Sequence, residues 1–334
     1  MKNIFGFDNI NIIDSFKLGK LHNCVLLCGK KGIGKASFIY NNVASTILSQ
    51  NSDIFEFNPN KIQKTEKLIS NNSHPDLLVI NIKTLDEDGK ENTSKKNEIN
   101  VSQVRNIIKQ TNYTNSISKY KVIVIDSIDE VNLNGQNALL KTLEEPDRNT
   151  FIFIVCNNLN NVLDTIKSRC MIYMVSDLSF ENWKNAVIQE DKKISNSLSD
   201  TELCELYEQS NKTVALALKM FRFNIFGFQK KILELFLNKN ILDISKFASE
   251  LEEKENFDMF KNSIDMIFNN LYKLINTSNK KIINENLYLE LLNNSSIKKV
   301  LDDRDYYNKL INDIKFYNLS KTHCINVLFN KIFV

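Results

Sequence analysis

Short apolar runs alternate with amphipathic segments through the first half of the chain. Apolar runs predict buried strands at residues 25–28, 77–80, 122–125, 151–156 and 171–175. Between the strands, apolar residues at helical spacing predict helices at 35–50, 101–110, 137–145 and 163–167, the third stopped by Pro146. Strands that alternate with helices in this way predict a parallel sheet covered on both faces.

Polar segments and the loss of strand patterns divide the chain further. Residues 51–73 are rich in Asn, Lys and Ser and predict a loop or weak helix, and residues 84–97 predict a mobile polar loop. After about residue 178 only amphipathic helical patterns continue, and a second boundary falls near Gly227. We therefore expect an α/β domain at 1–178, a small helical domain at 179–224 and a larger helical domain at 225–334.

Composition excludes several classes of protein. Of 334 residues, 43% are hydrophobic and 25% charged, which is typical of globular proteins, and the net charge of +3 excludes a strongly basic nucleic-acid coat. No apolar run approaches the ~18 residues of a membrane span, so we expect a cytoplasmic protein with no membrane association. The six cysteines lack metal-ligand spacing, and we expect reduced thiols and no metal site; they are Cys24, Cys28, Cys156, Cys170, Cys204 and Cys324.

A glycine-rich segment separates the first strand from the first long helix, as in a phosphate-binding loop. Its candidate nucleotide-binding residues are Gly29, Gly32, Gly34, Lys35, Ala36 and Ser37. Such loops place Ser or Thr directly after the lysine, to give Mg²⁺ a hydroxyl ligand. Here Ala36 takes that position, and Ser37 is rotated by about 100° along the helix. We predict a phosphate-loop fold with impaired metal binding, and nucleotide binding is left open.

The strand at 122–125 ends in Asp126, where a Walker B carboxylate would hold Mg²⁺. ATPases of the AAA+ class place Glu next, to orient the attacking water, but here Ser127 follows. We expect Asp129 and Glu130 to be carried away from the site, and we expect Asn157 and Asn158, in the sensor 1 region, to cap a turn. Without the hydroxyl and the water-orienting carboxylate, this site should not hydrolyse ATP.

Further motifs identify a family. They lie at Leu21–Asn23, His74–Leu78, Asn137–Pro146 (NALLKTLEEP) and Thr165–Cys170 (TIKSRC). With the phosphate loop, and in this order over residues ~4–175, they resemble the delta-prime subunits of the bacterial DNA polymerase III clamp loader. The resemblance implies an AAA+ α/β module, a helical lid and an all-α collar that mediates oligomerisation. In the sensor 2 region, residues 209–213, the family's arginine is not evident; Lys212 is the candidate.

The NALLKTLEEP block and Ser168–Arg169–Cys170 are shared by gamma/tau and delta-prime subunits, so an ATP-hydrolysing gamma-like subunit is the alternative. Lys35–Ala36, Asp126–Ser127 and the lack of a tau-type extension favour delta-prime. A phosphoryl-transfer enzyme for small molecules, the third reading, leaves Ser168–Arg169–Cys170 unexplained.

The resemblance implies a non-hydrolysing subunit of the DNA polymerase III holoenzyme, a DNA-directed DNA polymerase. It would be a monomer when isolated, and it would assemble with gamma/tau and delta to load the beta clamp on primer–template DNA. Arg169 would act in trans as an arginine finger at a neighbouring ATP site, with Ser168 and Cys170 beside it. The family often carries a four-cysteine zinc module after the first helix. Residues 51–73 contain no cysteine, so we predict no zinc and no required cofactor.

Overall fold

The computed structural model describes residues 6–7, 10–52, 54–84, 98–111, 113–276, 282–293 and 296–333. The predicted polar loop at 84–97 lies outside them from residue 85 onward. Contacts group the chain into two compact units. The first is Met1–Ala186 with Lys212–Ala215, and the second is Val187–Asn211 with Leu216–Val334.

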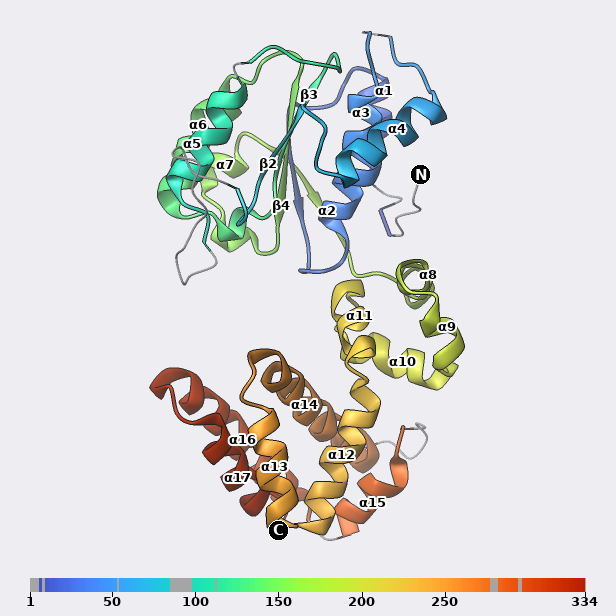
Figure 1. The fold of residues 1–334 in the computed structure, drawn as a ribbon, viewed down its shortest axis with the longest axis vertical. Coiled ribbons are helices and arrows are strands. Elements are labelled where there is room, and N and C mark those ends of the chain that lie inside the picture. The colour runs from blue at the N-terminus through green and yellow to red at the C-terminus, as the bar shows by residue number, and fades with distance from the viewer. Residues whose placement is uncertain are drawn as a thin grey trace. The chain divides into compact units, whose positions relative to one another are not determined.

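A parallel five-stranded sheet forms the centre of the first unit (Figure 1). The strands are β1 (Cys24–Cys28), β2 (Leu77–Ile80), β3 (Lys121–Ile125), β4 (Thr150–Cys156) and β5 (Met171–Met174), in the order β2-β3-β4-β1-β5. The three central strands are buried throughout, which explains their uninterrupted apolar sequences. All five predicted strands are confirmed within one residue at each end, and the predicted fold class is confirmed.

Helices cover both faces of this sheet, with α5, α6 and α7 on one side and α2 to α4 on the other (Figure 1). Their bounds are α1 Ile12–Lys17, α2 Lys35–Phe38, α3 Ser45–Leu48, α4 Pro59–Ser70, α5 Val101–Thr111, α6 Leu133–Glu144, α7 Asp164–Lys167 and α8 Phe180–Glu190. A π-helical stretch, Ile39–Ala44, joins α2 to α3, and short 3₁₀ turns lie at Ile128–Glu130 and Leu159–Asn161.

Two helices differ from their sequence-based predictions because of their caps. The segment expected to be a loop or weak helix contains the regular helix α4, whose amide groups at Asn60 and Lys61 donate to the Asn58 side chain, with Pro59 in the first turn. Helix α6 begins four residues before the predicted start at Asn137, because the Asn132 side chain accepts from the amide of Gly135. In both cases an asparagine sets the first turn.

The His74–Pro75–Asp76 motif is explained by a buried carboxylate. The side chain of Asp76, 1% exposed, accepts hydrogen bonds from the amides of Ser116, Ile117 and Ser118 at 2.6, 2.9 and 2.8 Å. The amide of Asp76 in turn donates to Nδ1 of His74 (3.2 Å), and burial lowers the pKa of this histidine. The motif therefore fixes the turn that leads into β3.

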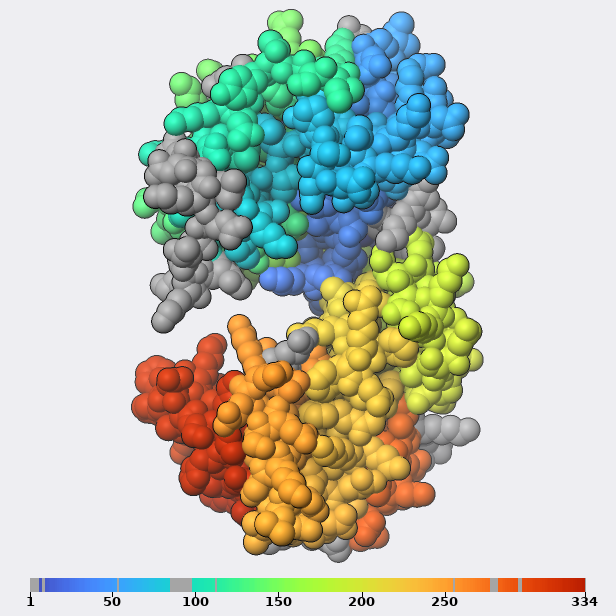
Figure 2. Space-filling model, in the orientation of Figure 1, coloured from blue at the N-terminus to red at the C-terminus, as the bar shows by residue number. Residues whose placement is uncertain are grey.

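The second unit is entirely helical in its described residues. Its helices are α9 Lys193–Ser197, α10 Asp200–Gln209, α11 Val214–Arg222, α12 Ile225–Asn238, α13 Ile241–Glu250, α14 Lys254–Asn276, α15 Glu285–Asn293, α16 Ile297–Tyr317 and α17 Lys321–Lys331. Figure 2 shows the surface of α13 beside that of α16 and α17.

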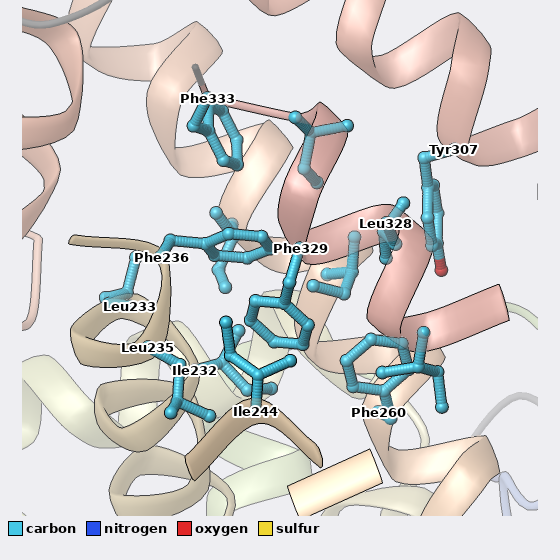
Figure 3. Close-up of a cluster of buried hydrophobic side chains, with 14 of the residues drawn as sticks. Ile232, Leu233, Leu235, Phe236, Ile244, Phe260, Tyr307, Leu328, Phe329 and Phe333 are labelled. Carbon is cyan, nitrogen blue, oxygen red and sulfur yellow. The ribbon is translucent and has the colours of Figure 1, made fainter. Parts of the chain in front are cut away.

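Aromatic side chains fill the core of this unit. Phe329 of α17 lies between Phe236 of α12 and Phe260 of α14 (Figure 3), with ring centroids 4.3 and 6.3 Å away. Phe333 closes the cluster at 5.1 Å from Phe236. The end of the described chain is held here, because the amide of Phe333 donates to the buried carboxylate of Asp303 (2.8 Å).

A polar contact joins the predicted lid to the predicted collar within the second unit. Glu205 of α10 accepts from the side chain of Asn270 in α14 (2.8 Å) and from the amide of Ile283 (3.3 Å), and burial raises its pKa. Asn270 also donates to the hydroxyl of Tyr288 in α15 (3.2 Å). The predicted boundary between lid and collar at residue 224 stays a prediction. The contacts group α10 and the collar helices in one compact unit and do not separate them there.

We predict that Asp76→Ala will lower the stability of the first unit by about 2–4 kcal/mol, because three amides lose an ionised acceptor and that of Ser118 is buried. Urea unfolding can be followed by the fluorescence of Trp183, which is the only tryptophan and lies in this unit. Asp76→Asn keeps one oxygen acceptor and should lose less. A loss below about 0.5 kcal/mol for Asp76→Ala, the range of neutral surface changes, would contradict this interpretation.

Candidate functional site

The loop from Gly29 to Gly34 connects β1 to α2, and its glycines meet specific backbone requirements. Gly32 and Gly34 have φ values of 84° and 108°, a region that side chains disfavour. A Cβ on Gly29 would lie 2.8 Å from the carbonyl oxygen of Val175. The loop therefore has the strand–loop–helix setting predicted for phosphate binding.

Lys35 turns back into its own loop. Its ammonium donates to the carbonyl oxygens of Gly29 and Lys30 at 2.6 and 2.7 Å and to Oδ1 of Asn157 at 3.0 Å. The residue is 3% exposed, and burial lowers the pKa of the amine, while Asp129 and Asp126 oppose that shift. An ammonium has three hydrogens, so these contacts use all of them. A phosphate would have to compete with them for the lysine.

The phosphate loop lacks the hydroxyl that usually gives Mg²⁺ a ligand after the lysine. Asp126 follows β3, and its pKa is raised by burial and by Glu130, against the effect of Lys35 and Lys31. Ala36 offers no oxygen ligand from its side chain, and Ser37 is exposed, as its predicted rotation requires. Asp126 supplies a carboxylate directly after β3, and no hydroxyl side chain directly follows Lys35.

The prediction that Asp129 and Glu130 lie away from the site is wrong. The 3₁₀ turn after Ser127 brings both residues back to the carboxyl edge of the sheet. Oδ2 of Asp129 accepts from the Ser127 hydroxyl (2.8 Å) and from the amide of Asn157 (2.6 Å). Glu130 forms an ion pair with Lys31 of the phosphate loop (3.1 Å). Spacing along the chain did not reveal this return.

The two asparagines after β4 have different roles. Asn158 caps the following 3₁₀ turn by accepting from the amide of Asn160, as predicted. Asn157 does more than cap a turn, because its side chain links Lys35 to the hydroxyl of Ser127 (3.0 and 3.1 Å). This role was not predicted from the sequence, although Asn157 lies in the sensor 1 region, where a polar residue beside the phosphate loop is expected.

The segment Lys212–Ala215 packs on the phosphate loop within the first unit. The amide of Ala215 donates to the carbonyl oxygen of Gly32 (3.2 Å), and a Cβ on Gly32 would lie 3.0 Å from that of Ala215. The sensor 2 candidate, Lys212, belongs to this segment.

Arg169 lies in the turn between α7 and β5. Its Nη1 donates to the carbonyl oxygen of Thr165 (2.7 Å) and to the hydroxyl of Ser168 (3.4 Å), and its Nη2 pairs with Oε1 of Glu144. The last contact joins the two most specific sequence motifs. A groove of about 600 Å³ surrounds it, lined by His22, Asn23, Leu143, Glu144, Pro146, Ser168 and Arg169.

Arg169 and the phosphate loop lie at opposite ends of the sheet. Met171, at the start of β5, pairs with Val25, whereas Met174 pairs with Cys28 just before the loop. The length of the parallel strands therefore separates Arg169 from its own loop. Cys170 is half-buried, and burial raises the pKa of its thiol to about 12, which leaves little thiolate for nucleophilic chemistry.

The described ranges show neither a cluster of metal-binding side chains nor a membrane-spanning helix. Within them, no group of three or more His, Cys, Asp and Glu side chains is placed to hold a metal ion. None of the helices described there combines the length and apolar character that crossing a membrane requires.

Comparisons with known proteins give the family. The family model described as "DNA polymerase III, delta subunit" matches residues 10–179. A DNA polymerase III subunit gamma of Buchnera aphidicola (from Schizaphis graminum) is 27% identical over 63% of this chain and 53% of its own. A subunit delta' of Pseudomonas aeruginosa is 32% identical over 32% of this chain and 30% of its own.

Among solved structures, a DNA polymerase III gamma-subunit-related protein of Thermotoga maritima aligns with 96% of this chain and 97% of its own, at 14% identity and a TM-score of 0.44. The chain spans about half the length of the Buchnera relative and less of the Pseudomonas one. The family model accounts for half of the chain and includes the phosphate loop, β3 and Arg169, and the chain therefore belongs to the family of DNA polymerase III, delta subunit.

Proposed function

We propose that this chain is a delta-prime subunit of a DNA polymerase III clamp loader that does not hydrolyse ATP. It would assemble in the cytoplasm with gamma/tau and delta and help to load the beta clamp on primer–template DNA. The observation that carries the proposal is the incomplete metal site, in which Ala36 replaces the hydroxyl and Ser127 replaces the glutamate after Asp126. The engaged ammonium of Lys35 supports it.

A gamma-like ATPase is the alternative, and a specific observation favours it. The Buchnera relative that matches 63% of this chain is named gamma, while relatives named delta' match up to 84% of it. In addition, Asp129 and Asn157 keep a polar network beside the loop, with Asp129 3 residues after Asp126. However, the carboxylate of Asp129 accepts hydrogen bonds from Ser127 and Asn157. The residue directly after Asp126, where the water-orienting glutamate would lie, is Ser127. We therefore favour the non-hydrolysing subunit.

The role proposed for Arg169 is to stabilise the negative charge that develops on the γ-phosphate while a neighbouring subunit hydrolyses ATP. A guanidinium offers several donors to a γ-phosphate and can raise the rate of hydrolysis ~10³–10⁵-fold in GTPases. Arg169 lies beside the edge strand β5 and at the end of the sheet away from its own loop. That position suits action on another subunit.

The C-terminal helices are proposed to form the collar that holds subunits together. These helices share one buried core, yet the end of α16 and the turn after it expose Phe316, Tyr317 and Leu319 at 83, 65 and 43%. Adjacent exposed apolar side chains of this kind are typical of protein–protein contacts.

We predict that the isolated chain is a monomer and has no Mg²⁺-dependent ATPase activity, because no hydroxyl follows Lys35 and no glutamate follows Asp126. Size-exclusion chromatography with light scattering and a phosphate-release assay test both statements. Lys35→Ala serves as the control for contaminating ATPases. A kcat of about 1 s⁻¹ or more that is lost in Lys35→Ala would support the gamma-like alternative.

We predict that Arg169→Ala leaves assembly of the loader intact and lowers its DNA- and clamp-stimulated ATPase by a few-fold, since one finger is lost while other sites keep theirs. Clamp loading should fall further, because it needs the sites to act together. Arg169→Lys should restore little, because an ammonium lacks the planar fork. Arg148→Ala, a change of an exposed arginine in the same unit, is the control. Wild-type clamp loading by the Arg169→Ala complex would refute the proposed role of Arg169 as an arginine finger.

We predict that Phe316→Asp weakens assembly with gamma/tau and delta by about five-fold or more, because truncating a central apolar contact residue often costs more than ~1 kcal/mol. Affinity can be measured by surface plasmon resonance with the full chain. Leu18→Asp, which changes an apolar side chain that is 70% exposed in the first unit, should have no effect. Equal affinities for Phe316→Asp and the wild type would exclude this surface from the collar contact.

A further inference from the structure

Glu144 is an acidic residue in an unfavourable place. It is the last residue of α6, where the negative end of the helix dipole disfavours a carboxylate. Its carboxylate is 48% exposed and makes an ion pair with Arg169 across 25 residues of sequence. Helix stability therefore does not account for this side chain, and its contact with Arg169 is the interaction that the structure shows for it.

The guanidinium of Arg169 has few donors left in this arrangement. Of its five N–H groups, two on Nη1 are directed to Thr165 and Ser168, and one on Nη2 is directed to Glu144. The Nε atom is buried and has no hydrogen-bond partner among the described residues. Two N–H groups therefore remain, one on the buried Nε and one on Nη2. To donate two hydrogen bonds to one phosphate, Arg169 must therefore give up its contact with Glu144, with Thr165 or with both.

We propose that Glu144 is a positioning residue that holds Arg169 against its own domain until the nucleotide of a neighbouring subunit displaces it. The inference rests on the proposed finger role of Arg169 and adds a control step to it. A carboxylate and a γ-phosphate carry the same sign of charge and compete for one guanidinium. Release costs little, because ion pairs this exposed are weak, so docking of a neighbour can drive it.

The retained state can be tested in the isolated full-length chain by chemical modification. Phenylglyoxal reacts with accessible guanidinium groups, and the chain has only five arginines: Arg105, Arg148, Arg169, Arg222 and Arg304. Mass spectrometry of peptides gives the rate at Arg169 relative to the exposed Arg148. We expect Glu144→Gln to raise this ratio about two- to five-fold. Glu145→Gln is the matched control: it changes the next residue, also exposed, and should leave the ratio unchanged.

The consequence for function is tested in the reconstituted loader. Glu144→Gln should raise the ATPase measured without DNA and clamp by up to about two-fold, because only one site receives this finger. The rise should vanish when Arg169→Ala is combined with it, which a merely structural role of Glu144 would not produce. Glu144→Asp keeps the charge and should stay closer to the wild type.

Three outcomes would overturn the proposal. An unchanged modification ratio in Glu144→Gln would show that Glu144 does not hold Arg169. A lower basal ATPase in Glu144→Gln would show that the ion pair supports the active position instead of the resting one. Wild-type ATPase and clamp loading by a loader with Arg169→Ala would refute the finger role of Arg169, and with it the control step. In that case the modification ratio would still report the ion pair between Glu144 and Arg169.

Discussion

All five strands of the sheet run in one direction, and this constraint fixes the relation between the two sites of the first unit. In a parallel sheet every strand ends at the same edge, so the phosphate loop, Asp126 and Asn157 gather there. Arg169 precedes β5 and must lie at the other edge. The carboxyl edge of the sheet therefore carries the polar network of the phosphate loop, and the amino edge carries a guanidinium that its own loop cannot use.

The carboxyl edge of the sheet gathers connected polar groups around the phosphate loop. Lys35, Asn157, Ser127 and Asp129 form a connected set of hydrogen bonds. A buried ammonium without partners would be costly, so carbonyl oxygens and an amide oxygen around Lys35 are required for stability whether or not phosphate binds. This network gives the loop a structural role that does not depend on ATP hydrolysis.

Polar contacts at other places connect elements that are distant in sequence. Asp76 holds the turn before β3, Gln136 of α6 donates to the carbonyl oxygens of Val131 and Asn161 and accepts from the amide of Leu163, and Glu205 ties α10 to α14. The contacts of Gln136 fix the chain just before α7 and so help to set the place of Arg169. Each is a buried or half-buried polar side chain, and those of Asp76 and Gln136 bond to backbone groups, which makes their geometry specific.

The sequence by itself determined the five strands, the parallel sheet, the phosphate-loop setting and the rotation of Ser37 away from the loop, because strand burial and helical periodicity are local properties. It also gave the motifs whose family match was later shown. It underestimated α4 and the start of α6, whose asparagine caps lie among many other asparagines and so carry little signal. The helices predicted at 101–110 and 163–167 agree with α5 and α7 to within one residue at each end.

Only the tertiary structure decided which polar residues meet. The return of Asp129 and Glu130 to the loop depends on a 3₁₀ turn and on contacts with β4 and the phosphate loop, which no spacing rule contains. The pairing of Glu144 with Arg169 likewise depends on how α6 and α7 pack on one face of the sheet. A local sequence pattern predicts the helix or strand in which a residue lies. Side-chain contacts between residues 25 or more positions apart depend on packing, and packing is a property of the whole fold.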